Sequence, residues 1–397
     1  MTTLRRPRQL ARWAFLSTAS LAVALTGCTA APPVGRGADI SSTSSTIPVV
    51  KPQHMKYVSP TGQDNGPGTA DSPWKTIDFA LTHTIKGDVL YVHGGTYREL
   101  VEKPHLHIGT ETRPIYVTNV PGERPVLEGA ISLTRPEYWN FSGLNVTWDP
   151  SLTNPPSFMV KITGGIGWSW RDSEFSGSLG AGNMFVGYAA VVIRNHVTRF
   201  DPKQWTLAGN CFHDLRPAAT SGHAANLVLG AMKHPRLGTV ERNIFFNNQG
   251  QDNITLGSAS GSPRKVLLRY NTIYGGRFAM TLAGAPRQIQ VTRNLIGGAN
   301  SEVLVRFDNS YAKGTRFFQN LAVDAARLLR PRADRAVGGA GNVLLEGAGP
   351  AGQTPTASPT STSSTTPPLP PIFSRSEGCD GFRTTLPEAI PYGRYGL

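Results

Sequence analysis

The chain has 397 residues, of which 16% are charged, 43 are glycine and 31 are proline. This composition disfavours an architecture of long helices and favours many turns and short strands. The formal net charge is +13, and it falls to +9 without Arg5, Arg6, Arg8 and Arg12, which lie in a segment that we expect to be removed. A basic protein of this kind could bind an acidic polymer, a membrane or a wall surface, or its positive charge could have no partner; the composition favours neither reading.

The first 28 residues are predicted to form an export signal. Basic residues precede an apolar run from Trp13 to Leu25, which is shorter than the ~20 residues needed to span a bilayer. The run ends in Leu-Thr-Gly-Cys, which resembles a bacterial lipobox, so we expect a lipid on Cys28 and an exported protein anchored to the membrane or envelope. A plain secretory signal is the alternative.

Residues 29–54 are rich in Ser, Thr and Pro and are predicted to form a flexible tether.

The folded part, residues 55–350, is predicted to open with a strand, a loop, one short helix and a second strand. Ser72 can cap the helix, Pro73 suits its first position, and Gly87 can adopt the left-handed conformation that ends it. The apolar face of this helix consists of Trp74, Ile77, Leu81 and Ile85. Such a helix can cover the open end of a solenoid of strands.

Short apolar strands then recur, each followed by a small polar residue. This residue is Gly143, Asp172, Asn195, Asn210, Asn243, Asn271, Asn294, Asn320 or Asn342 in successive repeats. Because Gly, Asp and Asn tolerate positive φ, we interpret the shared position as a tight left-handed bend. Asn195 and Asn210 are too close for one turn of three strands, so one of them is out of register or an irregular insertion lies there, for example at Phe200–Trp205.

Second apolar runs lie between these bends, in residues 225–230, 252–257, 278–283 and 302–307. Repeats of this kind predict an all-β fold: a single-stranded right-handed parallel β-helix, or solenoid, with a short N-terminal capping helix and stacked asparagines. A β-sandwich is disfavoured because tight hairpin signals are rare.

A second Ser/Thr/Pro-rich tract, residues 351–371, is predicted to be a loop or linker. The C-terminal segment, residues 372–397, is too short for a domain and either completes the folded body or is a loose tail. Cys211 and Cys379 can pair in an oxidising compartment, but their separation leaves this open.

Residues 57–99, with "SPWKTIDFAL" followed by "GDVLYVHGGTYRE", resemble the entry segment of the pectate-lyase-like right-handed parallel β-helix superfamily. That resemblance implies the same capped β-helix. It does not imply one reaction, since the superfamily includes polysaccharide lyases, glycoside hydrolases, epimerases and inert adhesins.

Residues 250–260 resemble the chondroitinase-B-like alginate lyases, distantly. Their pattern has two acids, two residues apart, before an Ile-containing strand, and a Lys after it. Asp252 matches the second acid, whereas Gly250 and Gly257 stand in the places of the first acid and the Lys. The resemblance therefore supports neither a Ca²⁺ site nor a Lys base here; Ca²⁺ stays an open cofactor, and no metal ligands are predicted.

The candidate site is the outward face of the second apolar runs. Arg306 or His223 would act as base or carboxylate clamp, with Asp252 as a third catalytic candidate or, equally, a strand cap. The substrate-binding candidates are Asn226, Gln251, Asn253, Thr255, Arg277, Thr281, Glu302 and, for exposed aromatic stacking, Trp205. Each has the alternative of being part of a solvated polar face.

The sequence thus predicts an exported, lipid-anchored, monomeric β-helix protein that acts on or binds polysaccharide. Our leading hypothesis is β-elimination of an acidic glycan by a lyase. A glycoside hydrolase with paired carboxylates and a non-catalytic glycan- or wall-binding protein are the alternatives. Nucleic acid is not an expected partner, because the arginines are dispersed and no recognition motif occurs.

Overall fold

The computed structural model describes residues 54–103, 106–152, 156–180, 182–193, 196–216, 224–233, 236–249, 252–257, 261–298, 303–307, 314–324, 327–329, 339–345, 379 and 392–394. The chain divides into two compact units, 1–49 and 50–397, and every described residue lies in the second. Cys28, the expected lipid attachment site, and residues 351–371 lie outside the described residues. No helix within the described residues is long and apolar enough to cross a membrane.

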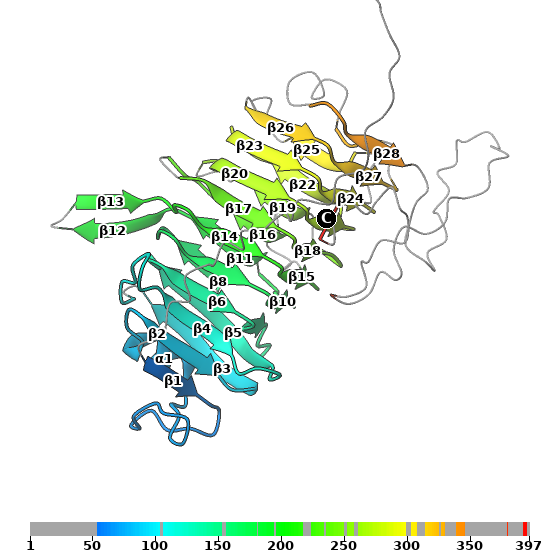
Figure 1. The fold of residues 1–397 in the computed structure, drawn as a ribbon. Helices are drawn as coiled ribbons and strands as arrows, with labels where there is room; N and C mark the ends of the chain where they lie inside the picture. Colours follow the sequence, from blue (N-terminus) through cyan, green and yellow to red (C-terminus); the bar gives the residue numbers. More distant parts are fainter. Residues whose placement is uncertain are drawn as a thin grey trace, which may run out of the picture. The chain divides into compact units, whose positions relative to one another are not determined.

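The second unit is a right-handed parallel β-helix (Figure 1), as the sequence predicts. Its first sheet, which we name sheet A, has ten strands. In spatial order they are β1 (His54–Val58), β2 (Asp88–Val92), β4 (Ile115–Asn119), β6 (Trp139–Ser142), β9 (Ser169–Arg171), β14 (Thr206–Ala208), β17 (Gly238–Glu241), β20 (Arg264–Arg269), β23 (Arg287–Thr292) and β26 (Thr315–Phe318).

The other sheet has 16 strands and two arms that meet at β5 (Pro125–Thr134), which also pairs with β3 (Gly95–Lys103). Arm 1 continues through β8 (Phe158–Thr163), β11 (Gly182–Gly187), β16 (Ala225–Leu229), β19 (Asp252–Leu256), β22 (Phe278–Leu282) and β25 (Val305–Phe307). Arm 2 consists of β7 (Asn145–Thr147), β10 (Glu174–Ser176), β15 (Cys211–His213), β18 (Ile244–Phe245), β21 (Thr272–Tyr274), β24 (Leu295–Gly297), β27 (Leu321–Val323) and β28 (Val343–Leu345).

The capping helix α1 (Ile77–His83) begins later than the sequence predicts. Its N-cap is Thr76, not Ser72, because two carboxylates satisfy the backbone donors there. Asp64 accepts hydrogen bonds from the backbone of Lys75 and Thr76, and Glu99 accepts from the first two helical N–H groups at 2.8 and 2.9 Å. Contacts from the preceding loop (Asp64) and from the first coil (Glu99) therefore decide where the helix begins, rather than the local preference of Ser72 and Pro73.

The predicted asparagine column exists from Asn210 to Asn342, and it begins one residue after the predicted Asp172, at Ser173; each of these members is joined to the next. The backbone N–H groups of Ser173, Asn210, Asn243, Asn271, Asn294 and Asn320 each donate to the side-chain oxygen of the following member, ending at Asn342, over 2.9–3.1 Å. The left-handed residue was predicted correctly at Gly143 (66°) and Asp172 (49°) and wrongly at the asparagines. Positive φ belongs to the residue before the asparagine, such as Arg242 (54°) and Tyr270 (55°).

The short spacing near Asn195 reflects an antiparallel hairpin, β12 (Ala189–Ile193) and β13 (His196–Phe200), which interrupts the parallel coils (Figure 1). Asn195 itself lies outside the described residues, but the strands on both sides of it belong to the hairpin. The insertion therefore precedes Phe200–Trp205, with Asn210 in register.

Aromatic side chains stack through the interior, one from each successive coil. Phe175, Phe212 and Phe245 follow one another with ring centroids 4.8 and 4.7 Å apart. Trp205 is only 1% exposed and stacks on Trp168 at 5.4 Å, so the prediction that it is exposed for sugar binding is wrong. Such pairs add ~1 kcal/mol each beyond the burial of their apolar area.

The described residues of the C-terminal segment, 379 and 392–394, pack on the outer surface of arm 2. Cys379 forms a disulfide with Cys211 of β15 across 168 residues, which resolves the question left open by the sequence. Tyr392 packs against an apolar cluster on that surface, which consists of Cys211, Ile244, Phe246, Tyr274, Leu295, Leu321 and Val323. The described parts of this segment therefore belong to the folded body.

Candidate functional site

The outward positions of arm 1 line up across six strands, because the strands pair in register. This row, which we call the outer row, consists of Lys161, Phe185, Val228, Thr255, Thr281 and Arg306. The residues on either side of each member point inward, as Ile254 and Leu256 do beside Thr255, and both are fully buried. With about 4.8 Å between neighbouring strands, the row is about 24 Å long.

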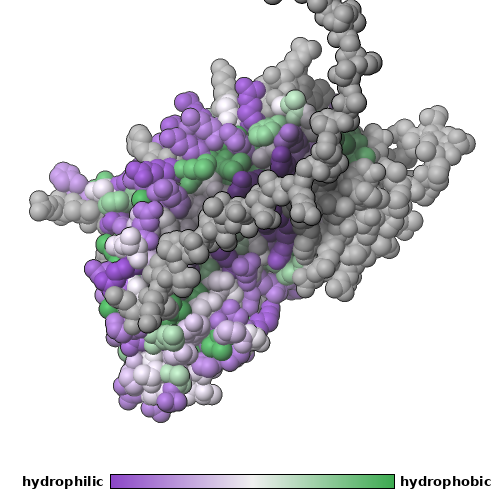
Figure 2. Space-filling model, in the orientation of Figure 1, coloured by the Kyte–Doolittle hydropathy of each residue, from purple (hydrophilic) through white to green (hydrophobic). Residues whose placement is uncertain are grey.

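The two ends of the outer row are more open than its centre. Lys161 is exposed, and Phe185 and Arg306 are half-buried. Thr255 and Thr281 occupy the outward register that the sequence predicts, but they are 9% and 1% exposed. Figure 2 shows a mixed surface in which hydrophilic residues prevail over smaller apolar patches.

An aromatic pair lies beside Lys161, and the sequence reasoning did not find it. The rings of Phe158 and Phe185 are 5.1 Å apart. A side chain at Gly187 or Gly230 would collide with the Phe185 ring, so these glycines provide the space in which the ring lies. The alternation in "FMVKIT" and "GNMFVG" was the available signal. The pair forms a half-exposed apolar surface next to a cation.

Two arginines lie within cation–π distance of Phe278 at the other end of the row. The guanidinium carbons of Arg306 and Arg277 are 5.4 and 5.5 Å from the centre of its ring. Phe278 is in register with Asp252, whose carboxylate accepts a hydrogen bond from the Thr255 hydroxyl at 3.2 Å. The fold therefore places four predicted residues, Asp252, Thr255, Thr281 and Arg306, on three adjacent strands, with Arg277 directly before the middle one.

Asn226 and Asn253 do not face outward, which corrects the prediction. Both are fully buried and form a second ladder: the Asn183 amide donates to Asn226 and the Asn226 amide to Asn253, each at 2.8 Å. The pairing of β-strands is interrupted at this position: Ala225 and Leu227 of β16 pair with Gly182 and Met184 of β11, whereas Asn226 has no paired residue. This local bend shifts the alternation by one residue. His223, Gln251 and Glu302 lie outside the described residues.

The backbone at Gly257 accounts for its departure from the lyase pattern. Gly257 has φ +110°, and a Cβ there would lie 2.1 Å from the carbonyl oxygen of Ala283. A lysine at this position would therefore require the chain to move.

Two described acids, Asp252 and Glu102, lie in the register of this face. Glu102 is five strand steps, or about 24 Å, from Thr255.

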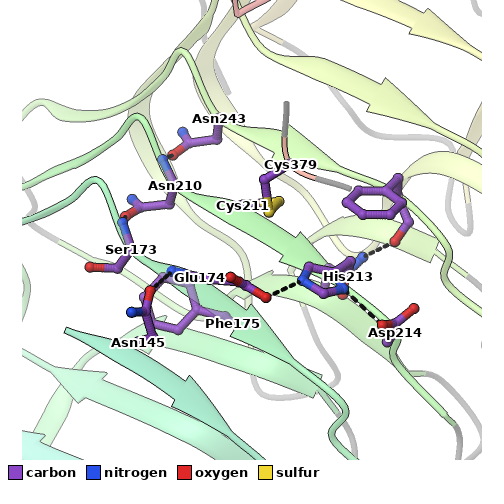
Figure 3. The surroundings of a disulfide bond; sticks show 12 residues. Asn145, Ser173, Glu174, Phe175, Asn210, Cys211, His213, Asp214, Asn243 and Cys379 are labelled. Carbon is purple, nitrogen blue, oxygen red and sulfur yellow. Dashed lines mark hydrogen bonds and ion pairs between the residues drawn. A yellow bond between two sulfur atoms is a disulfide. The ribbon is translucent and has the colours of Figure 1, made fainter. Parts of the chain in front are cut away.

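A histidine–carboxylate network occupies the outer surface of arm 2 (Figure 3). Glu174 Oε1 lies 3.0 Å from His213 Nε2, Asp214 Oδ2 lies 2.9 Å from Nδ1, and Arg124 donates to Glu174 at 2.6 Å. The bond to His213 is the largest cause that lowers the pKa of Glu174 to about 2; burial opposes it and Arg124 reinforces it. Burial disfavours a charged His213, but its two carboxylate partners outweigh burial and raise its pKa.

The comparisons agree with this fold. Residues 56–165 match a family model described as "Pel9A-like, right handed beta helix region". The crystal structure of pectate lyase Pel9A superposes with a TM-score of 0.51 at 15% identity, over 68% of this chain and 69% of that one. The chain has the fold of the pectate-lyase-like parallel β-helix proteins. At this identity the structural likeness concerns the fold alone.

Two sequence relatives match parts of the chain. Pectate lyase PEL9 of Emericella nidulans is 28% identical over 144 residues, which are 36% of this chain and 32% of the relative. The uncharacterized protein YwoF of Bacillus subtilis is 34% identical over 82 residues, 21% of this chain and 17% of the relative. The chain thus spans a third or less of these relatives.

Proposed function

We propose that this protein binds a linear acidic polysaccharide along the outer face of arm 1 and cleaves it by β-elimination. The observation that carries the proposal is the pair of guanidinium groups, Arg277 and Arg306, over Phe278 at one end of the outer row. The partial likeness to a protein named as a pectate lyase supports a glycan substrate.

The two arginines suit the carboxylates of uronic acids. A guanidinium is planar, stays charged and binds a carboxylate through two parallel hydrogen bonds. A polymer that crosses the strands meets a new strand about every 5 Å, which is close to the length of one sugar, so the outer row is about as long as five sugars. Its open ends, at Lys161 and Phe185 and at Arg306, would make the side-chain contacts. At its far end, Lys161 would bind a second carboxylate and Phe185 the apolar face of a sugar ring.

The proposed reaction needs a base and a neutralised carboxylate. The base removes the proton beside the carboxylate, the electrons form a double bond, and the glycosidic oxygen leaves and is protonated. Arg306 remains charged, because the guanidinium does not deprotonate in proteins, so we assign it to the carboxylate. We assign His223 as the base, since it precedes Ala225 by two residues and Ala225 is in register with Asp252.

A non-catalytic glycan-binding protein is the second candidate, and the closed backbone at Gly257 favours it. A hydrolase is disfavoured, because the two described acids of this face, Asp252 and Glu102, lie on strands that are five steps, or about 24 Å, apart, whereas paired carboxylates in glycosidases lie ~5–9.5 Å apart.

The test uses pectate, alginate and chondroitin with the purified protein. Elimination creates an unsaturated product that absorbs in the ultraviolet, whereas hydrolysis creates reducing ends without this absorbance. Arg306→Ala should weaken binding of the preferred polymer ~10–100-fold, the effect of losing one charge-assisted hydrogen-bonding group. Arg316→Ala, on the exposed face of sheet A, is the matched control and should bind normally. Tight binding without any absorbance change would select the non-catalytic protein; equal binding by both variants would refute the arginine clamp.

We further propose that the protein is exported and anchored through a lipid on Cys28, on the basis of the basic, apolar and Leu-Thr-Gly-Cys elements. Mass spectrometry of the mature N-terminus should find Cys28 as the first residue, carrying a lipid, and Cys28→Ser should leave the membrane fraction. An unmodified N-terminus at another position would refute the proposal.

A further inference from the structure

A group of metal-ligating atoms lies on the outer surface of arm 2, which the proposed polysaccharide face does not use. The sulfur atoms of Cys211 and Cys379 and a ring nitrogen of His213 all lie within 4.8 Å of one another. Within the described residues this is the one cluster of three such side chains. Cys211 and His213 are two residues apart on β15 and so face the same side.

We propose that reduction of the disulfide converts this cluster into a Zn²⁺ site, with Glu174 as the fourth ligand. A dithiol supplies two electrons and two protons to the sulfur–sulfur bond, which becomes two thiols, while the dithiol becomes a disulfide. Zn²⁺ then replaces the two thiol protons, which pass to solvent. Two thiolates, one imidazole and one carboxylate form a tetrahedral set of the kind that Zn²⁺ prefers.

The carboxylates are placed for this role. Glu174 is in register with Cys211 on the neighbouring strand, and its carboxylate contacts Nε2 of His213 at 3.0 Å (Figure 3). It is not within 4.8 Å of all three ligand atoms of the cluster, so its side chain must turn toward the sulfur atoms to bind the ion. Asp214 contacts Nδ1 on the opposite edge of the ring at 2.9 Å. A carboxylate on the far nitrogen orients a metal-binding imidazole and strengthens it as a ligand.

The surroundings hold the imidazole and balance the charge. The ring of Phe246 lies parallel to the His213 ring, at 4.9 Å and 14°. Arg124 contacts Glu174 at 2.6 Å and would offset the single negative charge of Zn²⁺ with two thiolates and one carboxylate.

Cys379 has a second anchor that survives reduction. Fourteen and fifteen positions further on, the backbone N–H of Gly393 donates to the carbonyl of Arg293 and that of Arg394 to the Thr272 hydroxyl, both at 3.1 Å. Tyr392 packs on the apolar cluster described above. These contacts do not involve the disulfide, so they keep residues 392–394 on the outer surface of arm 2 after reduction, and the Cys379 thiol stays in the same chain as its partner ligands at a raised effective concentration.

Co²⁺ is a suitable probe, because tetrahedral thiolate coordination gives a charge-transfer band in the ultraviolet and d–d bands in the visible region. The full chain carrying Cys28→Ser is reduced with dithiothreitol, freed of reductant under nitrogen and titrated with Co²⁺. The reduced protein should show both bands, Zn²⁺ should displace them, and the oxidised protein should show neither. His213→Ala and Cys379→Ser should each weaken Co²⁺ binding at least 100-fold, and Asp214→Asn ~10–100-fold.

His93→Ala is the matched control, since His93 also contacts a carboxylate, that of Glu123 at 3.2 Å, but belongs to another part of the fold. It should bind Co²⁺ as the parent does. The proposal is overturned if the reduced parent, folded by circular dichroism, shows no charge-transfer band, or if the oxidised protein binds Co²⁺ equally well. Because the parent is tested in both redox states, misfolding of a variant does not decide the outcome.

Discussion

Replacement of Asn271 by alanine tests the asparagine column. This side chain is fully buried, accepts hydrogen bonds from the backbone and the amide of Asn243 at 3.1 and 3.0 Å, and donates to Val240 and Asn294 at 2.9 Å each. Four bonds at about 1 kcal/mol each predict a loss of about 4 kcal/mol in the free energy of unfolding.

Urea denaturation followed by far-ultraviolet circular dichroism measures this loss. Gln290→Ala is the control, because Gln290 lies exposed on sheet A in the adjacent coil and its replacement should change stability by less than about 0.5 kcal/mol. If Asn271→Ala unfolds at the same urea concentration as Gln290→Ala, the ladder does not stabilise the coils and our reasoning about it is wrong.

Four further predictions concern arm 2 and the core. Since the pKa of Glu174 is lowered, its stabilising effect is complete above about pH 4.5 and is lost as the pH falls toward 2, so the acid-induced drop in melting temperature should be smaller in Glu174→Gln; a parallel acid profile would contradict this. Since the pKa of His213 is raised, its contribution is complete below about pH 6.5 and is lost as the pH rises through the raised value, so His213→Gln should flatten the alkaline side of the profile. Cys379→Ser should cost about 2–4 kcal/mol in urea unfolding, because the disulfide closes a loop of 168 positions, and an unchanged midpoint would show that the bond does not form. Trp205→Ala should cost about 3–5 kcal/mol while polysaccharide affinity per folded molecule stays the same; selective loss of affinity would return Trp205 to the binding face.

The coil architecture could be predicted because its signals are local and repeat. Asn243, Asn271 and Asn294 recur at spacings that suit one turn, and they do stack. The conformation of the bend could not be placed, because the positive φ falls on Arg242, Tyr270 and Arg293, residues with no preference for it. The tertiary ladder, and not the local preference of the residue, decides the backbone there.

The face of each side chain was predictable only where the strand alternates without a break. Thr255 and Thr281 were placed in the correct row, but Asn226 and Asn253 were not, because the chain bends at those residues and the alternation shifts. The helix start was missed for a similar reason, since Glu99, more than twenty residues after Ile77 and Asp78, supplies the acceptors for their N–H groups.

The groups on the outer surface of arm 2 could not be assembled from the sequence. Cys211 and Cys379 are separated by 168 positions, and Glu174 reaches His213 from a strand one coil earlier. No local spacing relates these residues, and only the register of β10 and β15 brings them together.

The central claim, that arm 1 holds an acidic polysaccharide, is tested most directly by a crystal structure with an oligouronide of about five sugars. Our account predicts that the chain of sugars crosses the strands from Lys161 toward Arg306, with a carboxylate hydrogen-bonded to the guanidinium of Arg306 or Arg277. An oligouronide bound to sheet A or to arm 2, with the outer row untouched, would contradict it.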